Sequence, residues 1–155
     1  IMTDQDPEFV VLGETRVYDF YALTTAIRLI ERGAKFIATN PDVSGPSDEG
    51  TLPAAGSVAA MIQAATGKAP YFVGKPNPVM IRAGLNKIGV HSENAAMVGD
   101  RMDTDVRAGV EAGMRTFLVL SGSTSAEQVS NFPFRPYRIY NGIGDLIRYV
   151  NPSSN

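Results

Sequence analysis

The stretch that decides the fold reads Ala95-Ala-Met-Val-Gly-Asp-Arg-Met-Asp-Thr-Asp105. Its first four residues form an apolar run that ends at Gly99, a pattern typical of a buried strand followed by a sharp turn. Residues 106–114 then place apolar side chains at helical spacing, which predicts a helix after the turn. The stretch therefore predicts a strand buried on both faces, a turn and a helix, with Asp100 at the carboxyl end of the strand.

Three carboxylates, those of Asp100, Asp103 and Asp105, fall within this one turn. In open α/β sheets, ligands bind outside the carboxyl ends of the strands. Three acids there repel one another unless a cation joins them, and oxygen ligands without Cys or His suit Mg²⁺. A structural alternative stays open for Asp103 and Asp105, because an N-cap or a first-turn acid stabilises a helix. Asp100 has no helix end to serve and is the stronger candidate.

Composition limits the class of protein. The chain has 155 residues, of which 44% are hydrophobic, a net charge of -2 and no cysteine. A nucleic-acid binder usually carries a basic stripe, which is absent here. Without cysteine, the chain holds no disulfide, thiol nucleophile or cysteine zinc site. No apolar stretch approaches the roughly 18 residues of a membrane span, so we expect a soluble, cytoplasmic protein.

Strands and helices alternate along the rest of the chain. Residues 9–12 and 36–38 are expected to be strands, and residues 21–32 between them a helix. This order with short connections predicts a right-handed parallel unit and an α/β fold. Further elements are expected at 54–66, 71–73, 79–88, 116–120, 126–129, 138–140 and 143–150.

Several polar residues lie outside the expected strands and helices. Residues 41–53 are rich in Pro, Gly, Ser and Asp. A connection of about 12 or more residues is usually functional or disordered, so this one is either a substrate-facing loop or a surface excursion. Asp4 and Asp6 precede Pro7 with no buried strand before them, and we expect a solvated turn. His91, the single histidine, is expected to be exposed and not to act as a base.

Lys75 lies in Gly74-Lys75-Pro76, directly after the strand expected at 71–73. Asn77 and Pro78 then form a helix start, with proline at the first helical position. Lys75 is therefore expected on the same edge of the sheet as Asp100. A lysine fixed there would bind a phosphoryl group and offset developing negative charge. The alternative is an ordinary exposed lysine.

Taken together, these stretches resemble the haloacid dehalogenase (HAD) superfamily. Gly74-Lys75-Pro76 and residues 98–105 are similar to its third and fourth motifs, and residues 36–42 resemble the cap of its NagD-like phosphatase branch. The resemblance covers residues 7–147. It implies a partial α/β cap at residues 1–70, the carboxyl-terminal half of a Rossmann-like HAD core with a parallel sheet at 71–150, and a tail at 151–155.

The resemblance also implies an activity and a site. It implies a Mg²⁺-dependent phosphatase that hydrolyses small phosphorylated metabolites through an aspartyl-phosphate. Lys75 would hold the phosphoryl group, Asp100 would bind Mg²⁺, and Asp105 would support the metal site. Asn40 and Asp42, in the cap, would face the substrate.

The chain departs from this family in one respect. Family members carry an Asp-x-Asp pair, nucleophile and general acid, on a buried first strand, and a hydroxyl motif on the next core strand. Asp4-Gln5-Asp6 lacks the strand, and Thr39-Asn40 aligns with the cap. We therefore expect the carboxyl-terminal part of a longer or nicked protein that is inactive alone. Its expected partner is the missing amino-terminal segment or a second copy of the chain.

Two functions other than phosphate-ester hydrolysis are a noncatalytic module and dinucleotide binding. A noncatalytic phosphate-binding or scaffold module remains the alternative, because fold does not fix function. Dinucleotide binding is not favoured, because no Gly-x-Gly-x-x-Gly follows any expected strand.

Overall fold

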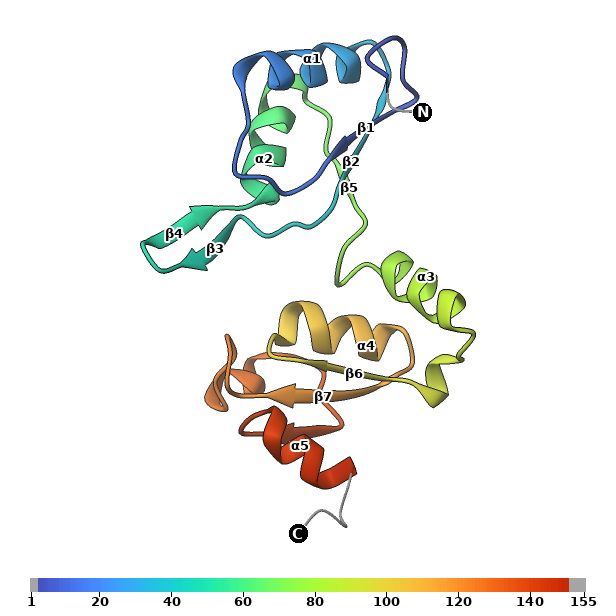
Figure 1. Cartoon of the computed structure of the whole chain (residues 1–155), viewed down its shortest axis with the longest axis vertical. Helices are drawn as coiled ribbons and strands as arrows, with labels where there is room; N and C mark the ends of the chain where they lie inside the picture. Colours follow the sequence, from blue (N-terminus) through green and yellow to red (C-terminus); the bar gives the residue numbers. More distant parts are fainter. Residues whose placement is uncertain (1–2, 151–155) are drawn as a thin grey trace. The chain divides into compact units, whose positions relative to one another are not determined.

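The computed structural model describes residues 3–150, which form two compact units, one ending at Gly74 and the other beginning at Lys75 (Figure 1). Each unit contains its own parallel sheet with helices packed on it, which confirms the predicted α/β class. Whether residues 1–70 are a cap and residues 71–150 a half core remains a prediction. Within residues 3–150, no helix reaches the length and apolarity of a membrane span.

The first unit is built on a parallel β-α-β arrangement. Strands β1 (Phe9–Leu12) and β2 (Lys35–Ala38) pair in parallel. Helix α1 (Phe20–Glu31) connects them along the chain. Helix α1 begins where the Asp19 carboxylate accepts the Ala22 N–H at 2.8 Å. Helix α2 (Ala55–Thr66) packs against α1 and β2. The buried core of this unit consists of Leu12, Ile30, Phe36, Ala38, Ala59 and Ile62.

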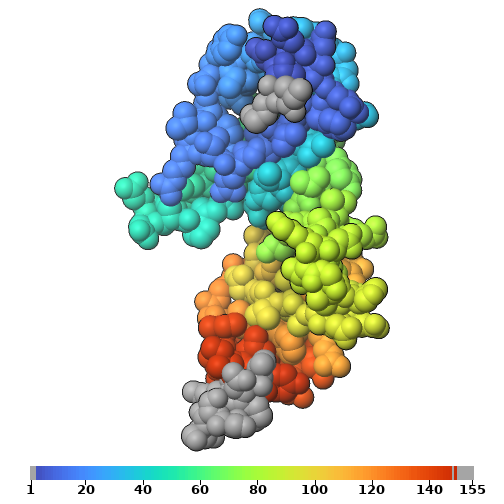
Figure 2. Space-filling view, turned by 45° about the vertical axis from the view of Figure 1, so that its right-hand side comes forward, coloured from blue at the N-terminus to red at the C-terminus, as the bar shows by residue number. Residues whose placement is uncertain are grey.

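The segment at 41–53 is not the irregular loop that its composition indicated. It contains an antiparallel hairpin of β3 (Ser44–Ser47) and β4 (Gly50–Pro53), which projects from the first unit (Figure 2). Gly50 follows the two turn residues with φ 118°, a conformation that glycine adopts readily. Ser, Gly and Pro have low strand propensity, so this hairpin left no strand pattern in the sequence.

The strand before Lys75 belongs to a different sheet from the one that was expected. Strand β5 (Tyr71–Phe72) pairs with β2, and the sheet order of the first unit is β1-β2-β5. Gly74 then passes so close to the backbone of Thr39 that a Cβ there would overlap the Thr39 carbonyl oxygen. Lys75 and Asp100 are therefore not delivered by neighbouring strands of one sheet. Sequence periodicity identifies a strand but not its pairing partner.

The second unit has a parallel sheet with the order β6-β7-β8. Its elements are α3 (Pro78–Ile88), a 3₁₀ turn η1 (Ser92–Asn94), β6 (Ala96–Gly99), a π-helical turn η2 (Met102–Val106), α4 (Arg107–Glu111), β7 (Arg115–Val119), a 3₁₀ turn η3 (Glu127–Asn131), β8 (Arg138–Tyr140) and α5 (Ile143–Val150). The predicted helix start is confirmed, since the Asn77 side chain accepts the Val79 N–H at 2.9 Å. The core around η2 and β7 consists of Met102, Val106, Leu118 and Val129.

Strand β6 differs from the expected strand buried on both faces. Ala96 is exposed and Val98 retains 39% of its exposure. Among the described residues, β6 pairs with β7 on one edge only. A short apolar run is compatible with either a central or an edge strand, and the sequence does not distinguish them. In place of one helix at 106–114, the chain forms the π-helical turn η2 and then the short helix α4.

Candidate functional site

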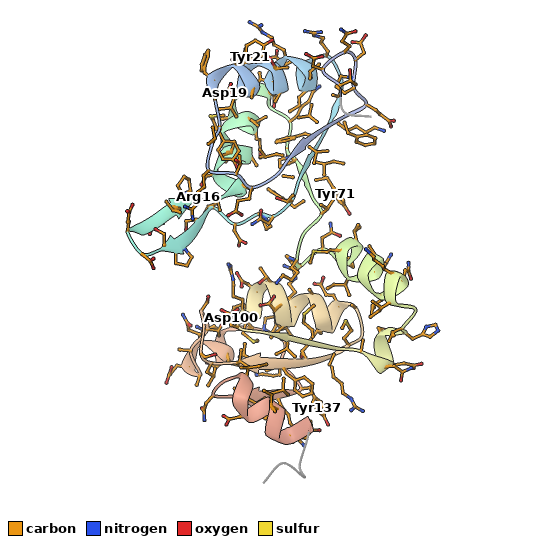
Figure 3. The ribbon with its side chains drawn as sticks, viewed as in Figure 1. Arg16, Asp19, Tyr21, Tyr71, Asp100 and Tyr137 are labelled. Carbon is orange, nitrogen blue, oxygen red and sulfur yellow. The ribbon has the colours of Figure 1, made fainter. Side chains whose placement is uncertain are left out.

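Asp100 lies immediately after β6, at the carboxyl end of the strand (Figure 3). The Ser123 N–H donates to Asp100 Oδ2 at 2.7 Å, and the Thr124 N–H donates to the Asp100 carbonyl at 3.1 Å. The backbone hydrogen bond from Ser123 lowers the pKa of the Asp100 carboxyl, because it favours the charged form. A Cβ at Gly122 would overlap the same carboxylate. The loop after β7 therefore holds Asp100 as an anion in one position.

Asp105 is buried beneath this turn, with 6% of its side chain exposed. Its Oδ1 accepts from Lys75 Nζ in an ion pair, and its Oδ2 accepts the Arg101 N–H at 3.2 Å. A Cβ at Gly99 would overlap the Asp105 carboxylate. Both oxygens are engaged, so Asp105 ties Lys75 to the turn that carries Asp100.

Lys75 brings a positive charge to the carboxyl end of β6 by this contact. Its side chain retains 40% of its exposure, while the carboxylate that holds it is buried. An ammonium group has three donors, and Asp105 takes one of them. The remaining donors suit a phosphoryl oxygen. The structure thus groups Lys75, Asp105 and Asp100, although a different path of the chain delivers the lysine.

Asp103 does not join this group. The Arg101 guanidinium donates from Nε to Asp103 Oδ1 at 3.0 Å and from Nη2 to Oδ2 at 2.7 Å. This side-chain hydrogen bonding lowers the pKa of Asp103. The first π-helical turn has no side-chain cap, so Asp103 is not an N-cap either.

The expected cluster of three carboxylates does not form in the part of the chain that the structure describes, and metal binding by Asp100 and Asp105 stays a prediction. Within residues 3–150, no group of three or more His, Cys, Asp or Glu side chains gathers in a way that would hold a metal. Each acid of the turn instead has its own partner: a backbone amide for Asp100, a guanidinium for Asp103 and an ammonium for Asp105. Arg101 and Lys75 are internal counter-ions that the spacing of the acids alone does not reveal.

The two acids Asp100 and Asp105 fit different roles at a Mg²⁺ site. Mg²⁺ is commonly bound by one or two carboxylates together with substrate phosphate and several waters. Asp100 is ionised and lies at the rim, so it fits as one such ligand. Asp105 is committed to Lys75 and to the Arg101 amide, so it fits a supporting role and not direct coordination.

Asn40 and Asp42 lie in the first unit, in the turn after β2. Asn40 Nδ2 donates to Asp42 Oδ2 at 3.1 Å, and Thr39 Oγ1 donates to Asn40 Oδ1 at the same distance. The Gly56 N–H also donates to the Asp42 carbonyl at 2.8 Å, which anchors the turn to the start of α2. The two side chains form one ordered polar turn. Their contact with a substrate remains a prediction.

Sequence reasoning missed the loop that holds Asp100. Ser123 supplies the amide, and Thr124 Oγ1 accepts the Met102 N–H at 3.2 Å. The available signal was a Ser-Gly-Ser-Thr run directly after the strand that neighbours β6. His91 is exposed, as predicted.

Comparison with known proteins agrees with this geometry. Residues 72–146 match the HAD-hydrolase-like family. The chain is 62% identical over 146 residues to dihydroxyacetone phosphatase from Corynebacterium glutamicum, a match that covers 94% of this chain and 53% of that protein. It is 45% identical over 145 residues to ribonucleotide monophosphatase NagD from Escherichia coli K12, covering 94% and 57%. The chain thus spans about half the length of these curated relatives.

Two solved structures also superimpose on this chain over about half of their own length. NagD from E. coli K-12 superimposes with a TM-score of 0.86 at 44% identity, covering 94% of this chain and 57% of that one. The 4-nitrophenylphosphatase from Thermotoga maritima superimposes with a TM-score of 0.88 at 40% identity, covering 96% and 57%. Residues 72–146 therefore match the HAD-hydrolase-like family, and the chain is homologous to about half the length of the NagD-type phosphatases.

Proposed function

We propose that this chain forms part of a Mg²⁺-dependent phosphatase that hydrolyses small phosphate monoesters through an aspartyl-phosphate. The observation that carries the proposal is the grouping of Lys75, Asp105 and Asp100 at the carboxyl end of β6. This arrangement sets a cation for a phosphoryl group beside an ionised carboxylate for a metal. The naming of several relatives as phosphatases supports the same reaction class.

Each of the three residues has a distinct role in the proposal. Lys75 binds phosphoryl oxygens and offsets their negative charge. Asp105 forms an ion pair with the lysine and holds it in place. Asp100 binds Mg²⁺, which supplies further neutralisation of the phosphoryl charge when it is bound.

The nucleophile is proposed to come from outside these 155 residues. An aspartate carboxylate oxygen bonds to phosphorus as the ester P–O bond breaks, the alcohol leaves with a proton from a general acid, and water then releases phosphate. The partially exposed strand β6 supports this part of the proposal, since its edge away from β7 pairs with no other strand among the described residues. A segment amino-terminal to these residues, or a second copy of the chain, would be the partner.

The substrate proposed first is dihydroxyacetone phosphate, because the relative with that name is 62% identical over the matched residues. Ribonucleoside monophosphates come second, on the 45% identity to NagD. The polar turn of Asn40 and Asp42 is proposed to contact the part of the substrate that leaves as the alcohol. The proposal includes a cytoplasmic location, with which the absence of cysteine is compatible.

The rate at which phosphate is released from dihydroxyacetone phosphate tests the proposal in two samples. One sample is the 155-residue chain alone; the other is a chimaera that joins it to the part of the C. glutamicum phosphatase that it does not match. We expect Mg²⁺-dependent hydrolysis of dihydroxyacetone phosphate by the chimaera and none by the chain alone. Turnover by the isolated chain would refute the external nucleophile. A folded chimaera that binds phosphate without turnover would instead favour the noncatalytic module.

A further inference from the structure

A second cationic pocket lies at the amino edge of the β6-β7-β8 sheet. Arg115 is the first residue of β7 and pairs with Ala96 at the start of β6, whereas Asp100 follows the other end of β6. At about 3.3 Å per strand residue, these edges are about 10–15 Å apart. Arg115 contacts the ring of Tyr137, which directly precedes the start of β8 at this same edge. The pocket is therefore separate from the candidate phosphatase site.

The pocket is an open depression on the surface, with a volume of about 460 Å³. Its wall combines basic, acidic, aromatic and apolar side chains from η1, the end of α4, the start of β7 and the approach to β8. The lining residues are Glu93, Val110, Gly113, Met114, Arg115, Thr116, Arg135 and Tyr137.

The arginines at this edge are held in place by contacts other than ion pairs. The guanidinium carbons of Arg115 and Arg138 lie 5.3 and 5.7 Å from the centroid of the Tyr137 ring, within cation–π range. Arg135 Nη1 donates to the carbonyl oxygens of Phe132 and Phe134. Among the described residues, none of these three arginines forms an ion pair with an acid. The lining thus carries two arginines, Arg115 and Arg135, against one carboxylate, Glu93, which leaves an excess of positive charge.

We propose that this pocket binds a small phosphate monoester that also carries hydroxyl groups. The planar guanidinium groups of Arg115 and Arg135 match the geometry of phosphate oxygens. Val110 and Met114 offer apolar contact for a short carbon skeleton, and the Glu93 carboxylate accepts hydrogen bonds from hydroxyl groups. The proposal does not depend on the phosphatase activity, because it uses residues at the other edge of the sheet.

An NMR titration tests this site with glycerol 2-phosphate as the probe. The Lys75→Ala chain without Mg²⁺ is used, so that the candidate phosphatase site does not contribute. We expect saturable shifts of the amide signals of residues 113–116, 135 and 137. The Arg115→Gln/Arg135→Gln double variant should weaken binding at least tenfold, whereas Arg82→Gln, an exposed arginine on α3, should not change it.

Two further arms separate charge from folding and phosphate from other anions. Replacing both arginines by lysine keeps the charge, so binding should fall by only a few fold while circular dichroism stays unchanged. Succinate, a dianion without phosphate, should bind at least tenfold more weakly than glycerol 2-phosphate. Shifts confined to other residues, binding unaffected by the double glutamine change, or equal affinity for succinate would each overturn the proposal.

Discussion

Lys75 and Asp105 form an ion pair in which the carboxylate is buried and the ammonium reaches the surface, with exposed side-chain fractions of 6% and 40%. The acid therefore depends on the lysine, because a buried charge without a partner is costly. The lysine keeps donors for a ligand. One contact thus links the stability of the turn to the charge that the proposed reaction uses.

The first prediction concerns this pair. Lys75→Met should lower the free energy of unfolding of the 155-residue chain by about 1–3 kcal/mol, since it leaves the Asp105 carboxylate buried without its cation. The double variant Lys75→Met/Asp105→Asn should lose less than the sum of the single changes, by about 1 kcal/mol. Urea unfolding gives the free energy of unfolding of Lys75→Met, of Asp105→Asn alone and of the double variant. Strict additivity would show that the two side chains do not interact.

The second prediction concerns the loop that positions Asp100. Gly122→Ala would push a methyl group into the Asp100 carboxylate, so we expect both a loss of stability of about 1–3 kcal/mol and a displaced acid. Gly144→Ala is the matched control, because a Cβ there meets no atom within 4 Å and the residue is helical. The control should be neutral or slightly stabilising. Equal effects of the two changes on thermal unfolding would contradict the account.

The third prediction concerns pH. The pKa of Asp103 is lowered in the folded chain by its hydrogen bonds to Arg101. A lowered folded pKa adds stability that is fully present above the unfolded value, about 3.9, and is lost as the pH falls through the folded value. The urea midpoint of Asp103→Asn should therefore fall less steeply than wild type below about pH 4. Arg101→Gln should flatten the curve in the same way, and an unchanged slope in both variants would contradict this role.

The fourth prediction concerns the metal ligand. Mn²⁺ shares the preference of Mg²⁺ for oxygen ligands and broadens nearby NMR signals. Adding it to the 155-residue chain should broaden the amide signals of residues 99–101 and 122–124. Asp100→Asn should remove this broadening, whereas Asp103→Asn should retain it, because Asp103 is occupied by Arg101. Broadening that is lost in Asp103→Asn but kept in Asp100→Asn would assign the metal to Asp103 and contradict the proposal.

The elements with a local signal were predictable from the sequence. Apolar spacing gave strand β1 and helix α1, and the Asn77-Pro78 start gave helix α3, because periodicity and capping depend on neighbouring residues. The parallel pairing of β1 with β2 followed from the short connections around α1.

The elements that depend on distant partners were not predictable. The pairing of β5 with β2 and the exposure of β6 depend on which strands meet, and the sequence does not specify this locally. The site shows the same division. Asp100 and Lys75 were identified from their places after strands, but Ser123 lies 23 residues from Asp100 and Asp105 lies 30 residues from Lys75. Only the folded chain shows that they meet.

The most direct test of the account is the rate of Mg²⁺-dependent phosphate release by variants of the chimaera. We predict that Asp100→Asn and Lys75→Met each lower kcat/KM for dihydroxyacetone phosphate by about 100-fold or more, since each removes a charge that faces the phosphoryl group. Arg82→Gln should leave the rate unchanged. Wild-type rates in the Asp100→Asn or Lys75→Met chimaera would contradict the claim that these two residues carry the reaction.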